Sequence, residues 1–133
     1  MSVGLLVITH SGIGNALLKT AESMLGFCPL QVALVEVSGS CEPDEIYAQA
    51  LETCRRLDQG QGVLVLTDMF GSTPSNIASR LVDRIAVQAV AGISLPMLVR
   101  VLNYPTLNLY ELVNKAITGG HDGILLCDSS ESD

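Results

Sequence analysis

The chain has 133 residues, a length typical of a single domain, and 48% of them are hydrophobic against 16% charged. This composition excludes intrinsic disorder, which requires low hydrophobicity and high net charge. The net charge of −7 repels nucleic acid and anionic lipid surfaces, so neither is an expected partner. Apolar runs such as Val3–Ile8 are too short to span a bilayer, and the N-terminal residues do not have the pattern of a secretory signal. Both observations predict a cytoplasmic protein.

Apolar runs alternate along the chain with segments of helical periodicity. The first half predicts strands at Val3–Thr9, Gln31–Val37 and Val63–Thr67, and helices at Asn15–Leu25 and from Pro43 to just before Gly60. Continuous apolar strands of this kind are typical of a parallel sheet that helices cover on both faces.

The second half continues the alternation. It predicts a helix at Pro74–Val82 with Thr73 as its N-cap, a strand at Ile85–Ala91, helical segments at Leu95–Leu102 and Asn108–Ile117, and a short last strand at Gly123–Cys127. The pattern as a whole predicts a three-layer α/β fold with a mostly parallel, doubly wound sheet. We expect one domain over residues 1–128 and a short acidic tail over residues 129–133.

The four cysteines are widely scattered and form no C-x-x-C motif. They are Cys28, Cys41, Cys54 and Cys127. This spacing predicts reduced, mostly buried thiols rather than a zinc site, and no metal or other cofactor is expected. Of the two histidines, His121 lies between Gly120 and Asp122 and is expected in an exposed loop.

Two polar clusters follow predicted strands. His10 comes after the first strand and Asp68 after the third. In open α/β sheets, ligands bind beyond the carboxyl ends of the strands, and neighbouring strand ends would bring these two side chains into one crevice. A carboxylate that faces an imidazole fixes its tautomer and leaves the other ring nitrogen free to act. The alternative is that Asp68 only bonds to its own turn.

The second cluster also has the features of an oxyanion site. Gly71, Ser72 and Thr73 lead directly into a predicted helix, whose unpaired N–H groups and dipole favour a phosphate. The hydroxyl groups add donors, although Thr73 equally suits a capping role. Nucleotide-binding and serine-hydrolase motifs fit less well, because the chain has neither a P-loop nor a G-x-S-x-G elbow.

These residues belong to a longer set of motifs that runs through nearly the whole chain. The set comprises Ile8-Thr9-His10, Leu17–Glu22, Gly62-Val63-Leu64, Asp68–Asn76, Ala78-Ser79-Arg80, Ala91-Gly92, Leu95–Leu98 and Glu111-Leu112-Val113. In this order, the motifs resemble the mannose-type IIA domain of the bacterial phosphoenolpyruvate:sugar phosphotransferase system, which includes fructose and sorbose subfamilies. The Asp68–Asn76 block is the most distinctive of them.

The resemblance implies a phosphoryl carrier. The residue matching His10 accepts phosphate from the phosphocarrier protein HPr and passes it to a IIB protein, while the residue matching Asp68 orients the imidazole through Nδ1. The residues matching Ser72 and Thr73 lie against the phosphoryl group. The family also forms homodimers in which the last strand, here Gly123–Cys127, crosses to the other subunit, and it meets the membrane only through other subunits.

Two departures from the family pattern leave the biological role open. Ser11 stands where some sugar-transport members have glycine, and it either donates to the phosphate or caps the turn. No IIB domain follows the last strand, so sugar uptake would need separate IIB and membrane proteins. The alternative is a standalone regulatory module whose His10 phosphorylation controls binding to a target. The phosphotransfer subunit of dihydroxyacetone kinase, which resembles this fold, fits the Asp68–Asn76 loop less well.

Overall fold

The computed structural model describes residues 2–83 and 86–128. The elements in chain order are β1 (Gly4–His10), α1 (Ile13–Leu25), β2 (Val32–Val37), α2 (Pro43–Leu57), β3 (Val63–Thr67), α3 (Thr73–Val82), β4 (Val87–Ala91), α4 (Leu95–Leu102) and α5 (Leu109–Asp122).

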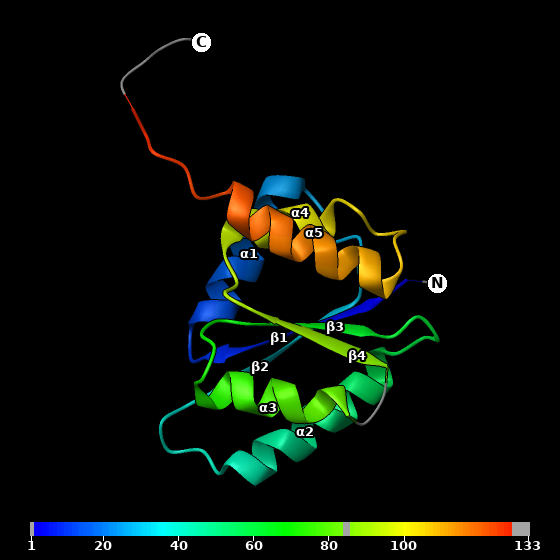
Figure 1. The fold of residues 1–133 in the computed structure, drawn as a ribbon. Helices are drawn as coiled ribbons and strands as arrows, with labels where there is room; N and C mark the ends of the chain where they lie inside the picture. Colours follow the sequence, from blue (N-terminus) through cyan, green and yellow to red (C-terminus); the bar gives the residue numbers. More distant parts are fainter. Residues whose placement is uncertain (1, 84–85, 129–133) are drawn as a thin grey trace.

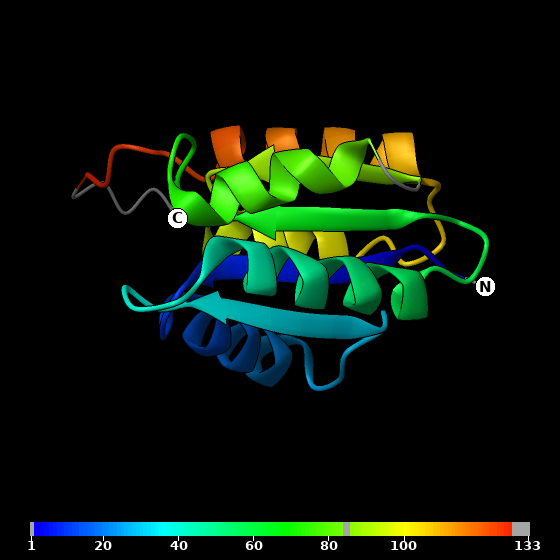
Figure 2. The same ribbon diagram turned by 90° about the horizontal axis from the view of Figure 1, so that it is seen from below.

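The strands form one open sheet in the order β2-β1-β3-β4, and every neighbouring pair is parallel. Helices α1, α4 and α5 cover one face of the sheet, and α2 and α3 cover the other (Figure 1). Seen from the second face, α2 and α3 lie side by side and run roughly along the direction of the strands (Figure 2). The predicted three-layer, doubly wound parallel fold is thereby confirmed.

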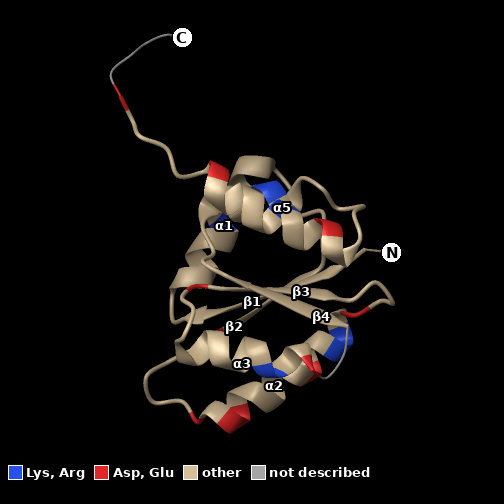
Figure 3. Ribbon diagram, in the orientation of Figure 1, with Lys and Arg blue, Asp and Glu red and all other residues tan. Residues whose placement is uncertain are grey.

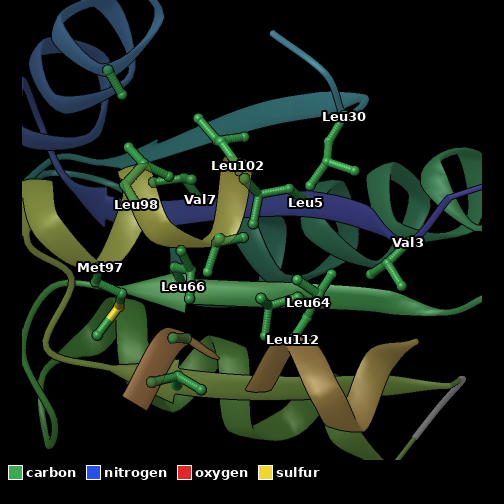
Figure 4. Packing of buried hydrophobic residues seen from close by; sticks show 14 of the residues in the cluster. Val3, Leu5, Val7, Leu30, Leu64, Leu66, Met97, Leu98, Leu102 and Leu112 are labelled. Atoms are coloured by element: carbon green, nitrogen blue, oxygen red, sulfur yellow. The ribbon is translucent and has the colours of Figure 1, made fainter. Parts of the chain in front are cut away.

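The core consists of two clusters of buried hydrophobic side chains, one on each side of the sheet. Alternate residues of the central strands supply both clusters: Leu5 and Val7 point to the α1 side, and Leu6 and Ile8 to the α2 side. Figure 4 shows the first cluster, where side chains of α4 and α5 pack onto β1 and β3. Double-sided burial explains why these strands read as continuous apolar runs.

Several helix ends differ from the sequence prediction. Helix α1 begins at Ile13, two residues early, because Gly12 adopts a left-handed conformation that turns the chain directly into the helix. The N-cap of α3 is Ser72, so the prediction of Thr73 as the cap was wrong. Thr73 is the first residue of the helix, and Pro74 follows it where an N–H group is not needed.

The largest difference lies at the C-terminal end. Helix α5 continues to Asp122, so His121 lies in its last turn rather than in a loop, although it is exposed as expected. The predicted strand at Gly123–Cys127 forms no part of the sheet in the described single chain. Ile124, Leu125 and Leu126 are 81%, 79% and 90% exposed. A strand needs a hydrogen-bonding neighbour, and this segment extends away from the sheet (Figure 1).

Two other predictions touch residues that the structure does not describe. The predicted fourth strand began at Ile85, which lies outside the described residues, and β4 starts at Val87. The predicted acidic tail, residues 129–133, lies outside them as well.

Charged residues are spread over the outside of the three layers. Figure 3 shows the basic positions scattered over helices of both layers, with no single basic face among the described residues. None of the helices in the described chain is both long and apolar enough to cross a membrane.

Candidate functional site

The site lies where β1 and β3 end. These strands are direct neighbours, with Ile8 opposite Thr67 in the register. His10 is the last residue of β1, and Asp68 follows the last residue of β3. Parallel strands end at the same edge of a sheet, so the order of the strands brings together two residues that are 58 positions apart in the sequence.

The Asp68 carboxylate binds His10 twice. Its Oδ2 lies 2.7 Å from Nδ1 of the imidazole and accepts the backbone N–H of His10 at 3.0 Å. The other oxygen, Oδ1, accepts the backbone N–H of Met69 at 3.0 Å. The side chain of Asp68 is only 11% exposed, whereas that of His10 is 45% exposed. The imidazole is therefore held at one nitrogen and open to solvent elsewhere.

The pKa of Asp68 reflects two opposing effects. Burial raises the pKa, but the side-chain and backbone hydrogen bonds from His10 and the attraction to its imidazole lower it, and the net pKa lies below the ordinary value. Asp68 is consequently a carboxylate at neutral pH. A carboxylate at this distance requires the proton of a neutral His10 to sit on Nδ1, which leaves the lone pair on Nε2.

Two further side chains hold the loop after His10, and the sequence analysis did not identify either. Thr9 Oγ1 donates to the carbonyl of His10 at 2.8 Å and accepts the N–H of Gly14 at 2.8 Å. On β2, Oε2 of Glu36 accepts the N–H of Gly12 at 3.0 Å. An acidic residue inside an apolar strand was the available signal for Glu36, but its target depends on the strand order.

In the loop before α3, two of the groups expected to donate to a phosphate already have hydrogen-bond partners in the protein. The N–H of Gly71 donates to Ser75 Oγ at 2.8 Å, and Ser72 Oγ donates to the carbonyl of Met69 at 2.6 Å. Ser75 Oγ in turn donates to the carbonyl of Ser72 at 3.0 Å. Two of the expected phosphate donors are therefore already bonded: the N–H of Gly71 to the first turn of α3, and the hydroxyl of Ser72 within the loop.

A cavity of about 280 Å³ lies beside His10. Its lining consists of His10, Val37, Ser38, Gly39, Cys41, Pro43 and Thr73. Thr73 is the predicted phosphate-binding residue that the structure places in this cavity. The turn between β2 and α2 supplies the opposite wall, which sequence analysis missed because turn residues carry no distinctive pattern.

The remaining predicted residues lie elsewhere. Ser11 is exposed at the start of the loop and does not line the cavity beside His10. His121 lines a different cavity, between β4, α4 and α5. Within the described residues, no three His, Cys, Asp or Glu side chains come close enough together to hold a metal ion.

Comparison with known proteins supplies the family. The model of the family described as "PTS system fructose IIA component" matches residues 4–117. The chain is 32% identical over 129 residues to the "PTS system mannose-specific EIIAB component" of Escherichia coli strain K12, with 93% of this chain covered. It spans only 39% of the length of that protein.

Two other similarities are more distant. The chain is 30% identical over 116 residues to the "Transcriptional regulatory protein LevR" of Bacillus subtilis. This match covers 83% of this chain and 12% of the length of LevR. The solved "Mannose/sorbose specific IIA subunit of phosphotransferase system" from Enterococcus faecalis superposes with a TM-score of 0.87, covers 98% of each chain and is 22% identical. That structure shares the fold.

On the match of the family model over residues 4–117, the chain belongs to the family of phosphotransferase-system fructose IIA components.

Proposed function

We propose that the protein is a phosphoryl carrier that accepts phosphate from phospho-HPr on His10 and passes it to a IIB protein during sugar uptake. The family assignment supports a role in phosphotransfer. The observation that carries the proposal is the contact of 2.7 Å between Nδ1 of His10 and the Asp68 carboxylate. This contact leaves Nε2 as the nucleophile on a half-exposed ring.

In the proposed reaction, the lone pair of Nε2 attacks the phosphorus of the donor phosphohistidine. A new P–N bond forms to His10 while the P–N bond of the donor breaks, and the donor imidazole leaves with that electron pair. The His10 ring then carries phosphate on Nε2 and a proton on Nδ1, so it is positively charged. The Asp68 carboxylate stabilises that charge through its bond to Nδ1. In the second transfer, the acceptor attacks the phosphorus, the P–N bond to His10 breaks, and the His10 imidazole leaves with that electron pair. Neither transfer needs a metal or cofactor.

The cavity beside His10 is the proposed place for the phosphoryl oxygens. Thr73 lies there at the start of α3, where its hydroxyl group and the positive end of the helix dipole favour an anion. For Ser72 and Gly71 to join, their bonds to Met69 and Ser75 have to exchange for bonds to phosphate. Ser11, which is exposed next to His10 and lies outside this cavity, is proposed as a further donor.

Transfer between proteins also needs a docking surface. Met69 and Phe70 follow Asp68 directly and are 60% and 83% exposed. Large apolar side chains at the rim of a site are typical of protein interfaces, where they bury surface on contact. Such docking suits protein partners such as HPr and IIB in the cytoplasm, and the acidic charge of the chain disfavours nucleic acid.

The direct test is phosphorylation by purified components. Wild-type protein and His10→Ala are incubated with phosphoenolpyruvate, Enzyme I and HPr, and the intact mass of each is recorded. We expect one acid-labile, alkali-stable phosphoryl group on the wild type and none on His10→Ala. Phosphate on both proteins would exclude His10 as the sole acceptor and point to His121, the other histidine. Phosphate on neither protein would contradict the carrier function.

A regulatory module is the second candidate, and the similarity to LevR favours it. In this case phosphorylation of His10 changes the affinity for a target protein rather than feeding a IIB protein. A pull-down that compares the phosphorylated protein with His10→Ala discriminates the two functions. A target that binds both forms equally well would count against the regulatory function, whereas rapid loss of phosphate to a IIB protein would favour transport.

A further inference from the structure

The loop that carries His10 is held by a carboxylate other than Asp68. Glu36 lies on β2 directly opposite Thr9 of β1, and its Oε2 accepts the N–H of Gly12 at 3.0 Å. Gly12 is two residues beyond His10, and its φ of 89° is left-handed. Glu36 is half-buried within a strand that is otherwise made of hydrophobic residues.

This bond has a clear local cause. The first N–H groups of a helix have no partners within the helix, and Gly12, the N-cap of α1, has no side chain to satisfy them. Thr9 takes the N–H of Gly14, and Glu36 takes that of Gly12. A carboxylate is favourable there because the N-terminal end of the helix dipole is positive. The start of α1 is therefore already occupied by an anionic side chain.

His10 is consequently fixed from three strands. Asp68, after β3, binds its N–H and Nδ1, and Thr9 of β1 binds its carbonyl. Glu36 of β2 secures the chain two residues later. The Cα atoms of His10 and Gly12 are at most about 7 Å apart, so a loop that is released at Gly12 also shifts the imidazole.

We propose that Glu36 is a positioning residue for His10, which acts through the N–H of Gly12 to hold the imidazole in line with the incoming phosphorus. This inference rests on the proposed phosphoryl-carrier function. In-line transfer depends steeply on placement, because a displacement of about 1 Å can lower a rate about 100-fold. Among the described residues, Glu36 makes only one hydrogen bond to this loop, that to Gly12, so we expect its loss to lower the transfer rate by less than about 100-fold.

The test compares variants that keep or remove the acceptor oxygen. Glu36→Ala and Glu36→Met both remove it, and Met preserves the length of the side chain. We expect each to lower the second-order rate of phosphoryl transfer from phospho-HPr on the order of 10-fold, equivalent to one charge-assisted hydrogen bond. Glu36→Gln keeps an oxygen at the same place and is expected within about 3-fold of the wild type. Glu52→Ala, which removes an exposed glutamate of α2, is the charge control and should be unchanged.

A second readout separates positioning from stability. The ¹⁵N shifts of the His10 ring in the unphosphorylated protein report which nitrogen carries the proton. Glu36→Ala and Glu36→Met are expected to increase the fraction that lacks the Nδ1 proton, at temperatures well below unfolding. Unchanged shifts and rates in these folded variants would overturn the proposal, as would a Glu36→Gln protein as slow as Glu36→Ala. If the wild type takes no phosphate, the carrier function fails, and the ring shifts still decide the role of Glu36.

Discussion

At the scale of single residues, one carboxylate organises the site. Asp68 accepts three N–H groups, from the backbone and imidazole of His10 and from the backbone of Met69. These bonds keep it charged although its side chain is largely buried. An unpaired charge in such a position would be costly, so the carboxylate and the His10 loop depend on each other.

Replacing Asp68 by Asn tests this dependence. The amide preserves the size of the side chain and one acceptor oxygen, but it has no charge to stabilise a phosphorylated, positively charged ring. We expect the fold to persist and phosphorylation of His10 to slow by about 100-fold, in the range seen for one electrostatic group in a site. Stopped-flow transfer from phospho-HPr measures the rate. Wild-type kinetics in Asp68→Asn would remove Asp68 from the mechanism.

The lowered pKa of Asp68 also predicts a pH dependence of stability. The folded-state pKa lies below the ordinary 3.8, so the stabilisation is complete above that value and is lost as the pH falls through the folded pKa. Urea unfolding between pH 6 and about pH 3 measures it. The wild type is expected to lose more of its free energy of unfolding over this range than Asp68→Asn. Equal losses would show that Asp68 makes no such contribution.

Cys54 gives a second prediction at this scale. Burial, with a smaller effect of the nearby Asp58, raises the pKa of this thiol to about 11. About one molecule in a thousand then carries the thiolate at pH 8, and the side chain is fully buried. A protein with Cys54 as its sole cysteine should resist alkylation until it is unfolded. The matched protein that keeps only the exposed Cys127 should react at once, and equal rates would contradict the burial of Cys54.

At the scale of elements, the first turn of α1 sits closely against the sheet. A Cβ atom on Gly14 would lie 2.6 Å from Leu34 Cδ1 and 2.9 Å from Thr9 Oγ1. Leu34 can rotate, but Thr9 is fixed by its bonds to Gly14 and His10. Gly14→Ala is therefore expected to lower the free energy of unfolding by about 1–3 kcal/mol. Thermal and urea unfolding measure the change.

Gly39 provides the matched control. A Cβ atom there meets nothing within 4 Å, and its φ is not left-handed. Gly39→Ala should leave the stability unchanged or raise it by up to about 1 kcal/mol, because alanine reduces the freedom of the unfolded chain. If Gly14→Ala were as stable as Gly39→Ala, the packing of α1 against Thr9 would be looser than the distances indicate.

Elements that depend on local pattern were predictable, and contacts between strands were not. The buried strands Gly4–His10 and Val63–Thr67 stand out as apolar runs. By contrast, the bond from Gly12 to Glu36 requires β2 to lie beside β1, and no local pattern encodes that neighbour. The cap of α3 was misplaced for a related reason, since Ser72 and Thr73 both suit the position by residue type.

At the scale of the whole molecule, the order of the strands builds the site. β1 lies between β2 and β3, so its last residue meets side chains from both neighbours. The sheet continues from β3 to β4, which leaves β4 at an open edge. The resemblance implied that the last strand, Gly123–Cys127, crosses to the other subunit of a homodimer. The single chain forms the His10 site without that strand, and the two features are therefore testable separately.

The exposed end of the chain predicts an association of two copies. Ile124, Leu125 and Leu126 are at least 79% exposed, and an apolar run of this kind favours burial against another surface. Sedimentation is expected to show a wild-type dimer and a monomer after all three are changed to Ser. Met24 and Phe27, which are 61% and 65% exposed at the end of α1, serve as the control, and their change to Ser should leave the dimer intact. A triple variant that remains a dimer would place the interface on the helices instead, whereas a monomer that still accepts phosphate would show that His10 works within one chain.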